Sequence, residues 1–223
     1  RKYGNAGPMK TLTPDQVSIA EFHSYLLGAV APRPIALAST VDRAGNVNLS
    51  PFSFFNVFGS NPPTLVFSPN RRVRDGSGKD TLDNVLEVPE VVIHAVDYSM
   101  VEQVSLSSCE YPKGTNEFIK AGFSAEPSLK VRPPRVKEAK AAFECAVKDV
   151  ITLGEGGGGA PNLVICEVLA LHVAEELLNA EGRLDTTRTD WVARMGGDWY
   201  CRAGVEARFE VPKPNVQLGV GVD

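Results

Sequence analysis

The stretch that decides the fold spans residues 35–68 and reads IALASTVDRAGNVNLSPFSFFNVFGSNPPTLVFS. It contains four short apolar runs, which are separated by residues rich in Gly, Asn, Asp and Pro. Short apolar and β-branched runs between turn residues are typical of strands. Gly45, in the segment DRAGN, can adopt the positive φ that a hairpin turn requires. Four strands so close together predict an antiparallel meander or barrel.

Further strands and a helix are expected on either side of this stretch. Apolar or alternating runs over residues 91–96, 143–148 and 162–173 have the length and pattern of strands. The segment TPDQ at residues 13–16 has the pattern of a capping box and predicts the start of a helix. No internal repeat and no linker interrupts the pattern. We therefore expect one β-rich domain, of the all-β or α+β class, with short peripheral helices.

Composition excludes several classes of protein. The 223 residues include 23 Lys and Arg against 27 Asp and Glu, a net charge of −4, whereas a nucleic-acid binder usually has a basic domain. No apolar run reaches the ~18 residues needed to span a bilayer, and the start lacks the apolar stretch of a signal peptide. We therefore expect a cytoplasmic protein without nucleic-acid or membrane partners. The first residue is Arg1 rather than Met, so the true N-terminus is left open.

The cysteine and histidine spacing argues against a metal site. Neither C-x-x-C nor H-x-x-x-H occurs among the four cysteines and three histidines. This pattern predicts neither a zinc ribbon nor a disulfide framework. A G-x-S-x-G nucleophile motif is also missing, so no catalytic side chain is predicted. If the chain is an enzyme, we expect a bound cofactor to supply the chemistry.

Basic side chains are concentrated in the N-terminal part of this acidic protein. Residues 1–80 contain nine basic and five acidic side chains. The tripeptide Lys79-Asp80-Thr81 joins a cation and a hydroxyl to the expected start of a short helix, where Asp80 can act as the cap. A cation, a hydroxyl and free helix N–H groups suit a phosphate monoester. An ordinary capped helix start would have the same sequence.

Two more segments allow both a functional and an ordinary interpretation. Arg71, Arg72 and Arg74 could bind a phosphate or pyrophosphate, or they could belong to a solvated loop. The run GEGGGG at residues 154–159 precedes Ala-Pro, whereas a phosphate-binding loop would continue with Lys and Ser or Thr. We interpret this glycine run as a mobile hairpin connection.

The segment SPFSFFN at residues 50–56 combines aromatic rings with hydroxyl and amide groups. Alternation along a strand places Phe52 and Phe54 on one face, and Ser53 and Phe55 on the other. Such a surface suits a flat heterocycle that needs stacking and edge hydrogen bonds. A core strand with satisfied hydroxyl groups is the alternative.

Several segments taken in series resemble the flavin reductase-like, FMN-binding split-barrel family, and within it the flavoredoxin-like branch. Each segment is weak evidence alone, but their order agrees and they cover most of the chain, from about residue 25 to residue 205. The matching segments are PRPI at 32–35, STV at 39–41, NLSPFSFFN at 48–56, FSP at 67–69, KDT at 79–81 with Asn84, EYPKG at 110–114, EF at 117–118, KVRPPRV at 130–136, NLVI at 162–165, GRLD at 182–185 and RMGGDWY at 194–200.

The resemblance implies a Greek-key split β-barrel that binds FMN noncovalently, as a homodimer with flavin sites near the subunit interface. It places two strands against the isoalloxazine ring and the ribityl chain, and a lysine, a serine and a threonine near the phosphate. The cofactor-binding residues that it implies are Arg33, Ser39, Thr40, Val41, Ser53, Phe54, Phe55, Asn56, Ser68, Lys79, Asp80, Thr81, Asn84, Arg194 and Tyr200. His94 departs from the pattern, because a small polar residue such as Asn is expected in its strand.

The activity implied by the resemblance is that of an NAD(P)H-dependent flavin reductase. NADH or NADPH would transfer a hydride to FMN N5, and the reduced flavin would pass electrons to an acceptor or to a monooxygenase partner. The alternative is a non-enzymatic, flavoredoxin-like electron-relay protein that holds FMN for a protein redox partner. Whether FMN is a prosthetic group or a substrate is left open.

Overall fold

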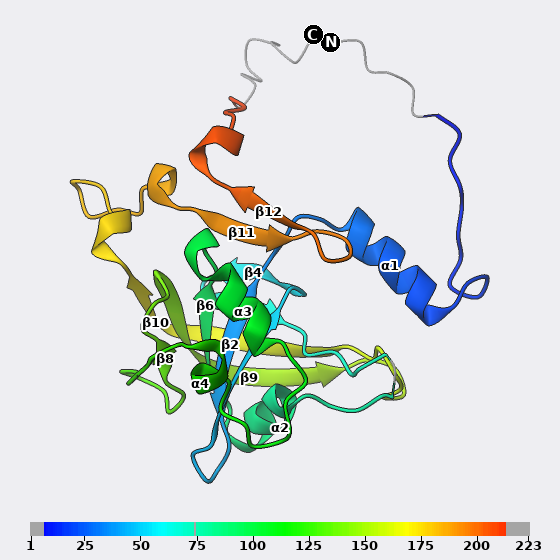
Figure 1. The fold of residues 1–223 in the computed structure, drawn as a ribbon, viewed down its shortest axis with the longest axis horizontal. Coiled ribbons are helices and arrows are strands. Elements are labelled where there is room, and N and C mark those ends of the chain that lie inside the picture. The colour runs from blue at the N-terminus through cyan, green and yellow to red at the C-terminus, as the bar shows by residue number, and fades with distance from the viewer. Residues whose placement is uncertain (1–6, 74, 213–223) are drawn as a thin grey trace.

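Antiparallel strands dominate a fold to which helices are added at the edges (Figure 1). A computed structural model describes residues 7–73 and 75–212. The helices are α1 (Ile19–Ala29), α2 (Asp80–Glu87), α3 (Val101–Ser107) and α4 (Glu117–Ala121), with 3₁₀ turns η1 (Tyr98–Met100), η2 (Glu175–Leu177), η3 (Thr186–Arg188) and η4 (Val205–Ala207). The strands are β1 (Arg33–Pro34), β2 (Ala36–Val41), β3 (Val47–Phe52), β4 (Phe55–Ser60), β5 (Pro63–Phe67), β6 (Glu90–Ala95), β7 (Ala125–Glu126), β8 (Arg135–Val136), β9 (Ala141–Thr152), β10 (Asn162–Val173), β11 (Trp191–Arg194) and β12 (Tyr200–Ala203).

The main sheet is a barrel with an open seam. Among the described residues, seven strands pair in the order β3-β2-β6-β9-β10-β5-β4, and every pairing is antiparallel. The two edge strands, β3 and β4, follow one another in the chain with only Ser53 and Phe54 between them. Edges joined by two residues must lie close together, so the sheet is rolled up, yet β3 and β4 do not pair in this set of strands. The fold is therefore the split barrel that the sequence predicted.

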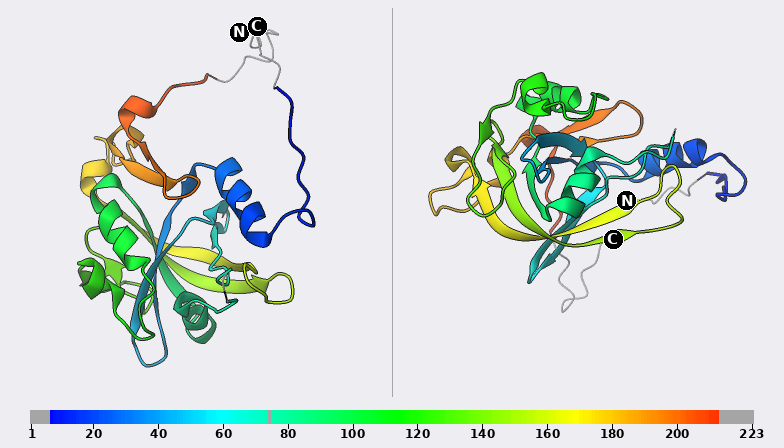
Figure 2. Two further views of the ribbon diagram at one scale, coloured as in Figure 1. Left: turned by 45° about the vertical axis from the view of Figure 1, so that its right-hand side comes forward. Right: turned by 90° about the horizontal axis from the view of Figure 1, so that it is seen from below.

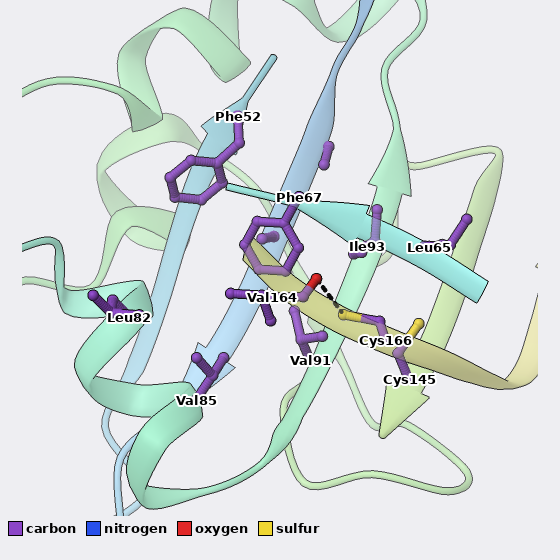
Figure 3. Packing of buried hydrophobic residues seen from close by; sticks show 12 residues of the cluster. Phe52, Leu65, Phe67, Leu82, Val85, Val91, Ile93, Cys145, Val164 and Cys166 are labelled. Carbon is purple, nitrogen blue, oxygen red and sulfur yellow. Dashed lines mark hydrogen bonds between the residues drawn. The ribbon is translucent and has the colours of Figure 1, made fainter. Parts of the chain in front are cut away.

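The interior of the barrel is apolar and well packed (Figure 3). The rings of Phe52 and Phe67 lie 5.4 Å apart at an interplanar angle of 44°. Leu82 and Val85, from α2, belong to the same cluster, so this helix covers one end of the barrel. Burial raises the pKa of the Cys145 thiol to about 12, so this cysteine is a neutral packing residue.

A second apolar layer lies outside the barrel, between the sheet and helices α3 and α4. Period-two alternation on β2 sends Ala36 and Ala38 into the barrel and Leu37 into the outer layer. Met100, before α3, and Phe118, of α4, belong to that outer layer. Every residue of β2 is buried, because both faces of the strand are covered.

Helix α1 and the β11–β12 hairpin form the side of the molecule next to the seam (Figures 1 and 2). Their closest approach is at Gly196, where an added Cβ would lie 3.2 Å from the Cα of Gly28. All of α1 is described, and its residues keep part of their surface exposed. Within residues 7–73 and 75–212, no helix combines the length and the apolar character needed to cross a membrane.

Two local expectations from the sequence are wrong. The TPDQ segment makes only a turn, in which the Gln16 N–H donates to Thr13 O at 3.0 Å, and α1 begins at Ile19 after the N-cap Ser18. The continuous alternating strand expected for the segment SPFSFFN at residues 50–56 is broken by a bend at residues 53–54. The long strand expected over residues 162–173 is confirmed as β10.

His94 is a core residue of β6 rather than part of a cavity wall. Its ring is fully buried, Nδ1 lies 2.8 Å from Leu37 O, and Nε2 lies 2.8 Å from the Val136 N. The backbone N–H of Val136 can only donate, so Nε2 must be unprotonated and the proton must be on Nδ1. Desolvation by burial lowers the pKa of His94 to about 4.

We expect His94 to make stability fall as the pH falls from about 6.5 to about 4. Over that range the unfolded chain binds a proton at this residue and the folded chain does not, which costs about 3 kcal/mol of unfolding free energy. Urea titrations of the wild type and of His94→Asn at several pH values measure this difference. An equally steep pH dependence in both proteins would contradict the assignment.

Candidate functional site

A pocket of ≈ 600 Å³ lies at the seam of the barrel. Its wall combines the end of β3, the bend at residues 53–54, the loop after β5, the end of α3 and the β11–β12 hairpin. The lining residues are His23, Leu27, Arg33, Ile35, Pro51, Phe52, Ser53, Phe54, Ser68, Asn70, Arg71, Arg72, Val73, Lys79, Val104, Ser105, Ser108, Glu110, Gly159, Arg194, Asp198 and Tyr200.

The aromatic side of the pocket depends on the bend in the chain. Strict alternation would place Ser53 and Phe54 on opposite faces, but the bend lets both line the pocket. Phe52 lines the pocket and also packs in the barrel core, and Phe55 packs against the same core, so the predicted face assignment is wrong for Phe55. The Phe54 ring meets the edge of the His23 ring at a centroid distance of 6.1 Å. A hydroxyl group and an aromatic ring thus adjoin each other in the wall.

Arg33 joins several parts of the pocket wall through hydrogen bonds. Its guanidinium is 5% exposed and donates to Leu27 O at 2.5 Å, Val30 O at 2.6 Å and Met195 O at 2.9 Å. Its Nε donates to the Ser53 hydroxyl at 3.3 Å. One side chain therefore joins the end of α1, the bend at the seam and the β11–β12 hairpin. Most of its donors are used by the protein itself, which makes Arg33 a positioning residue.

Three basic residues line another part of the pocket. Lys79 Nζ lies 4.9 Å from the centroid of the Phe52 ring, and burial together with the nearby charge of Arg72 lowers the pKa of Lys79. Arg72 donates to the Ser77 hydroxyl at 3.0 Å and to Gly78 O at 2.8 Å. Arg71 and Arg72 are therefore part of the pocket wall rather than of a fully solvated loop. The arrangement favours an anionic group here, because an anion would offset the mutual repulsion of the cations.

The N-terminus of α2 adds to this basic region. Lys79 is the N-cap of the helix and makes no side-chain capping bond. The interpretation of Asp80 as the cap is wrong, since Asp80 is the first residue inside the helix. A helix end without a side-chain cap leaves backbone N–H groups for an anion, next to the Lys79 ammonium group.

Two hydrogen-bonded pairs fix α2 on the barrel. Asn84 Nδ2 donates to Thr40 Oγ1 at 3.0 Å, and Asn48 Nδ2 donates to Thr81 Oγ1 at 2.9 Å. All four residues are buried. Thr40, Thr81 and Asn84, which the family resemblance assigned to the cofactor, thus bind to one another or to Asn48 and hold the helix in place.

The predicted binding residues fall into two groups in space. Seven of the fifteen line the pocket: Arg33, Ser53, Phe54, Ser68, Lys79, Arg194 and Tyr200. The other eight are not among its lining residues: Ser39, Thr40, Val41, Phe55, Asn56, Asp80, Thr81 and Asn84. In the first group, the Arg194 guanidinium lies 4.5 Å from the centroid of the Tyr200 ring and donates to Gly197 O at 2.7 Å.

Sequence reasoning missed the contribution of α3 and its surroundings. Ser105 and Ser108, Glu110 and Asp198 all line the pocket. Glu110 Oε1 lies 3.5 Å from Arg72 Nε and limits the positive charge there. Glu110 and Asp198 belong to segments that match the family, and this match could have identified them as site residues. His23 lies on α1 with no recognisable motif, so only the packing of α1 could reveal it.

A barrel that is open at one seam, with an aromatic and cationic pocket beside it, has the features of a flavin-binding protein. The family model described as "Flavin reductase like domain" matches residues 28–188, and the chain belongs to that family. Nitrilotriacetate monooxygenase component B from Bacillus cereus has a similar structure, with a TM-score of 0.85 and 30% identity over 92% of this chain and 100% of that one. For the Pseudomonas fluorescens 2-nitrobenzoate 2-nitroreductase NbaA the TM-score is 0.81, with 28% identity over 92% and 97% of the two chains. The uncharacterized protein BH2278 of Halalkalibacterium halodurans is 38% identical over 92% of this chain and 97% of its own length.

Replacing Lys79 is expected to separate phosphate binding from ring binding. Lys79→Ala removes a charge-assisted contact, so we expect FMN affinity to fall about tenfold or more while riboflavin affinity changes little. Flavin fluorescence titrations measure both. Lys113→Ala is the control, because Lys113 is an exposed lysine whose Nζ lies 3.8 Å from the carboxylate of Asp83 in α2. Equal losses for the two flavins would remove Lys79 from the phosphate site.

The pH dependence of flavin binding gives a second test of the role of Lys79. Lys79 binds an anion only while it is protonated, and its pKa is lowered. An ordinary lysine titrates at pH ~10.4. As the pH rises, the preference for FMN over riboflavin should therefore begin to decline before that pH is reached. This decline should be missing in Lys79→Ala.

Replacing Arg33 is expected to affect all flavins alike. Arg33→Lys keeps the charge but cannot serve three carbonyl groups and a hydroxyl at once, so the unfolding free energy should fall by about 2 kcal/mol or more. FMN and riboflavin affinities should fall by the same factor, because the whole pocket wall loosens. Urea denaturation and the flavin titrations test this, and a selective loss of FMN would show that Arg33 binds the phosphate directly.

Proposed function

We propose that this protein binds FMN in the seam pocket and acts as an NAD(P)H-dependent flavin reductase. One observation supports this most strongly: a single pocket joins the hydroxyl and aromatic groups of Ser53 and Phe54 to the basic residues Arg71, Arg72 and Lys79. FMN has the matching polarity, since a flat heterocycle is at one end and a phosphate monoester at the other. The family assignment supports the same flavin-binding, reductase-type chemistry.

The polar groups of the pocket fit the phosphate end of FMN. Arg71 Nε is buried and has no hydrogen-bond partner among the described residues. A buried donor without a partner costs free energy, which an anionic oxygen would recover. Lys79 and the N–H groups at the start of α2 add further donors for a phosphate, whereas the Ser68 hydroxyl donates to Asn70 Oδ1 at 2.5 Å. A cluster of cations next to a helix N-terminus is the usual chemistry for such a group.

The roles of the chain follow from this placement. When bound, FMN supplies the redox chemistry, because its ring accepts a hydride from a reduced nicotinamide. Ser53 can hydrogen-bond the ring edge, and the Phe54 ring offers an apolar surface next to it. The Arg194 guanidinium lies over the Tyr200 ring in the wall of the same pocket, where a nicotinamide donor could enter. The hydride step needs no acid or base from the chain.

The eight predicted residues outside the pocket wall act through the barrel in this proposal. Thr40, Thr81 and Asn84 hold α2 so that its N-terminus faces the anion. Asp80 lies in the first turn of that helix. Ser39, Val41 and Phe55 shape the barrel next to the seam, and Asn56 begins its exposed edge on β4.

Homodimerisation and a protein partner are further parts of the proposal. On β4, Val57 is 65% exposed and Phe58 is 68% exposed, and α1 likewise has exposed apolar side chains, among them Ile19 and Leu26. A second copy of the chain that covers this surface would place two flavin sites near one interface. The likeness to component B of a monooxygenase supports an oxygenase as the acceptor of reduced flavin. Sedimentation velocity tests the dimer.

Activity measurements distinguish the reductase from an electron relay. Purified protein should oxidise NADH or NADPH at a rate that rises with added FMN, and absorbance at 340 nm measures the rate. The flavin spectrum after desalting shows whether FMN is retained. Retained FMN with no oxidation of either nucleotide would contradict the reductase and favour the relay. A protein that neither retains FMN nor quenches its fluorescence would contradict flavin binding altogether.

A further inference from the structure

The tip of the β9–β10 hairpin lies against the loop that carries the pocket arginines. We call residues 153–161 the glycine tip, and residues 70–73 and 75–78 the arginine loop; Arg74, between the two parts of the loop, lies outside the described residues. The Arg71 N–H donates to Ala160 O at 3.0 Å, and the Gly159 N–H donates to Arg71 O at 3.1 Å. Figures 1 and 2 show the two segments side by side, although they are far apart in the chain. Both hydrogen bonds are made to the backbone of the same arginine.

At Gly158 the arginine loop leaves no room for a side chain. A Cβ added there would lie 2.6 Å from Val73 O and 3.2 Å from Arg72 O. Real Cβ atoms do not approach backbone oxygens at 2.6 Å, so any other residue would push the arginine loop away. The adjacent Gly157 differs, because nothing lies within 4 Å of its added Cβ. The requirement for glycine at position 158 thus comes from contact with the arginine loop.

The arginine loop is also braced from within. The Gly76 N–H donates to Arg72 O at 2.8 Å, and the Arg72 N–H donates to Ser77 O at 3.0 Å. The Arg71 guanidinium donates from Nη1 to Gly76 O at 3.2 Å, which leaves Nε buried without a partner among the described residues. Arg71 and Arg72 are thus both hydrogen-bonded to Gly76. We therefore expect a displacement of Val73 to shift the Arg71 side chain as well.

The charges at this end of the pocket require a ligand of matching sign. Arg71, Arg72 and Lys79 all line it, as does Glu110, whose Oε1 lies 3.5 Å from Arg72 Nε. Three cations against one carboxylate leave an excess that a phosphate monoester, with a charge of about −1.5 to −2 at pH 7, would neutralise. Arg71 has the unused buried donor among them.

We propose that the glycine tip is a positioning element. Through Gly158 it holds Arg71 where its side chain can bind the phosphate of the flavin. The Arg71 Nε–H donates to a phosphate oxygen, and Gly158 allows the close backbone contact that holds the arginine loop in place. The glycine run thereby serves a phosphate indirectly, by supporting a loop, and not by wrapping the phosphate itself. This inference rests on the proposed FMN binding.

The test compares Gly158→Ala with the matched control Gly157→Ala. In Gly158→Ala we expect the Kd for FMN to rise about tenfold or more, since one charge-assisted contact is displaced, and the Kd for riboflavin to stay within about twofold. In Gly157→Ala both values should stay within about twofold. Fluorescence titration measures the two constants. A purely structural role for Gly158 would raise both constants together, and that result, or an unchanged Kd for FMN, would overturn the proposal.

A double-mutant cycle with Arg71→Met tests whether the effect passes through Arg71. Arg71→Met alone should also raise the Kd for FMN selectively, and the double variant should lose little more than the more affected single variant. Fully additive losses would overturn the positioning role. If Gly158→Ala does not fold, Arg71→Met still decides, because an unchanged ratio of FMN to riboflavin affinity contradicts the proposal. Failure of the wild type to bind FMN would instead overturn the proposed function on which this inference rests.

Discussion

The unpaired seam between β3 and β4 is the constraint on which the rest of the structure depends. Two edge strands joined by only Ser53 and Phe54 must come together, but their backbones do not pair. The chain therefore bends where it crosses from one edge to the other, and the bend presents a hydroxyl and a ring to the same side. Edges that do not pair need other support, which here comes from Arg33 and its four hydrogen bonds. The opening that remains is the pocket.

Two basic residues of this pocket illustrate how surroundings determine a role. Arg33 is buried among carbonyl groups, so its donors are used within the protein. Lys79 lies above an aromatic ring, beside Arg72 and an uncapped helix N-terminus, and within the described part of the chain its ammonium group makes no hydrogen bond like those of Arg33. A guanidinium can link several backbone oxygens in one plane, whereas an ammonium group is a compact charge. The first stabilises the wall, and the second is available for an anion.

Much of the framework could be predicted from the sequence. The strand at residues 162–173 was predicted to the residue, because a long run of apolar and β-branched side chains favours a strand. The split barrel was predicted from the series of family-like segments. The helix start predicted at Thr13 is wrong, because the same capping residues can close an isolated turn. The bend at residues 53–54 also escaped the period-two pattern, since alternation assumes a continuous strand.

By itself, the sequence determined the β-rich class, the order of the strands along the chain, and the residue types suited to a flat ring and a phosphate. Only the tertiary structure decided which of those residues share one pocket. Lys79 lies in its wall, whereas Thr81, two positions later, bonds to Asn48. The glycine run, which is uninformative as a motif, meets the arginine loop through backbone contacts between distant segments. Such contacts depend on how the sheet rolls up, and the closure of the sheet cannot be inferred from local residue patterns.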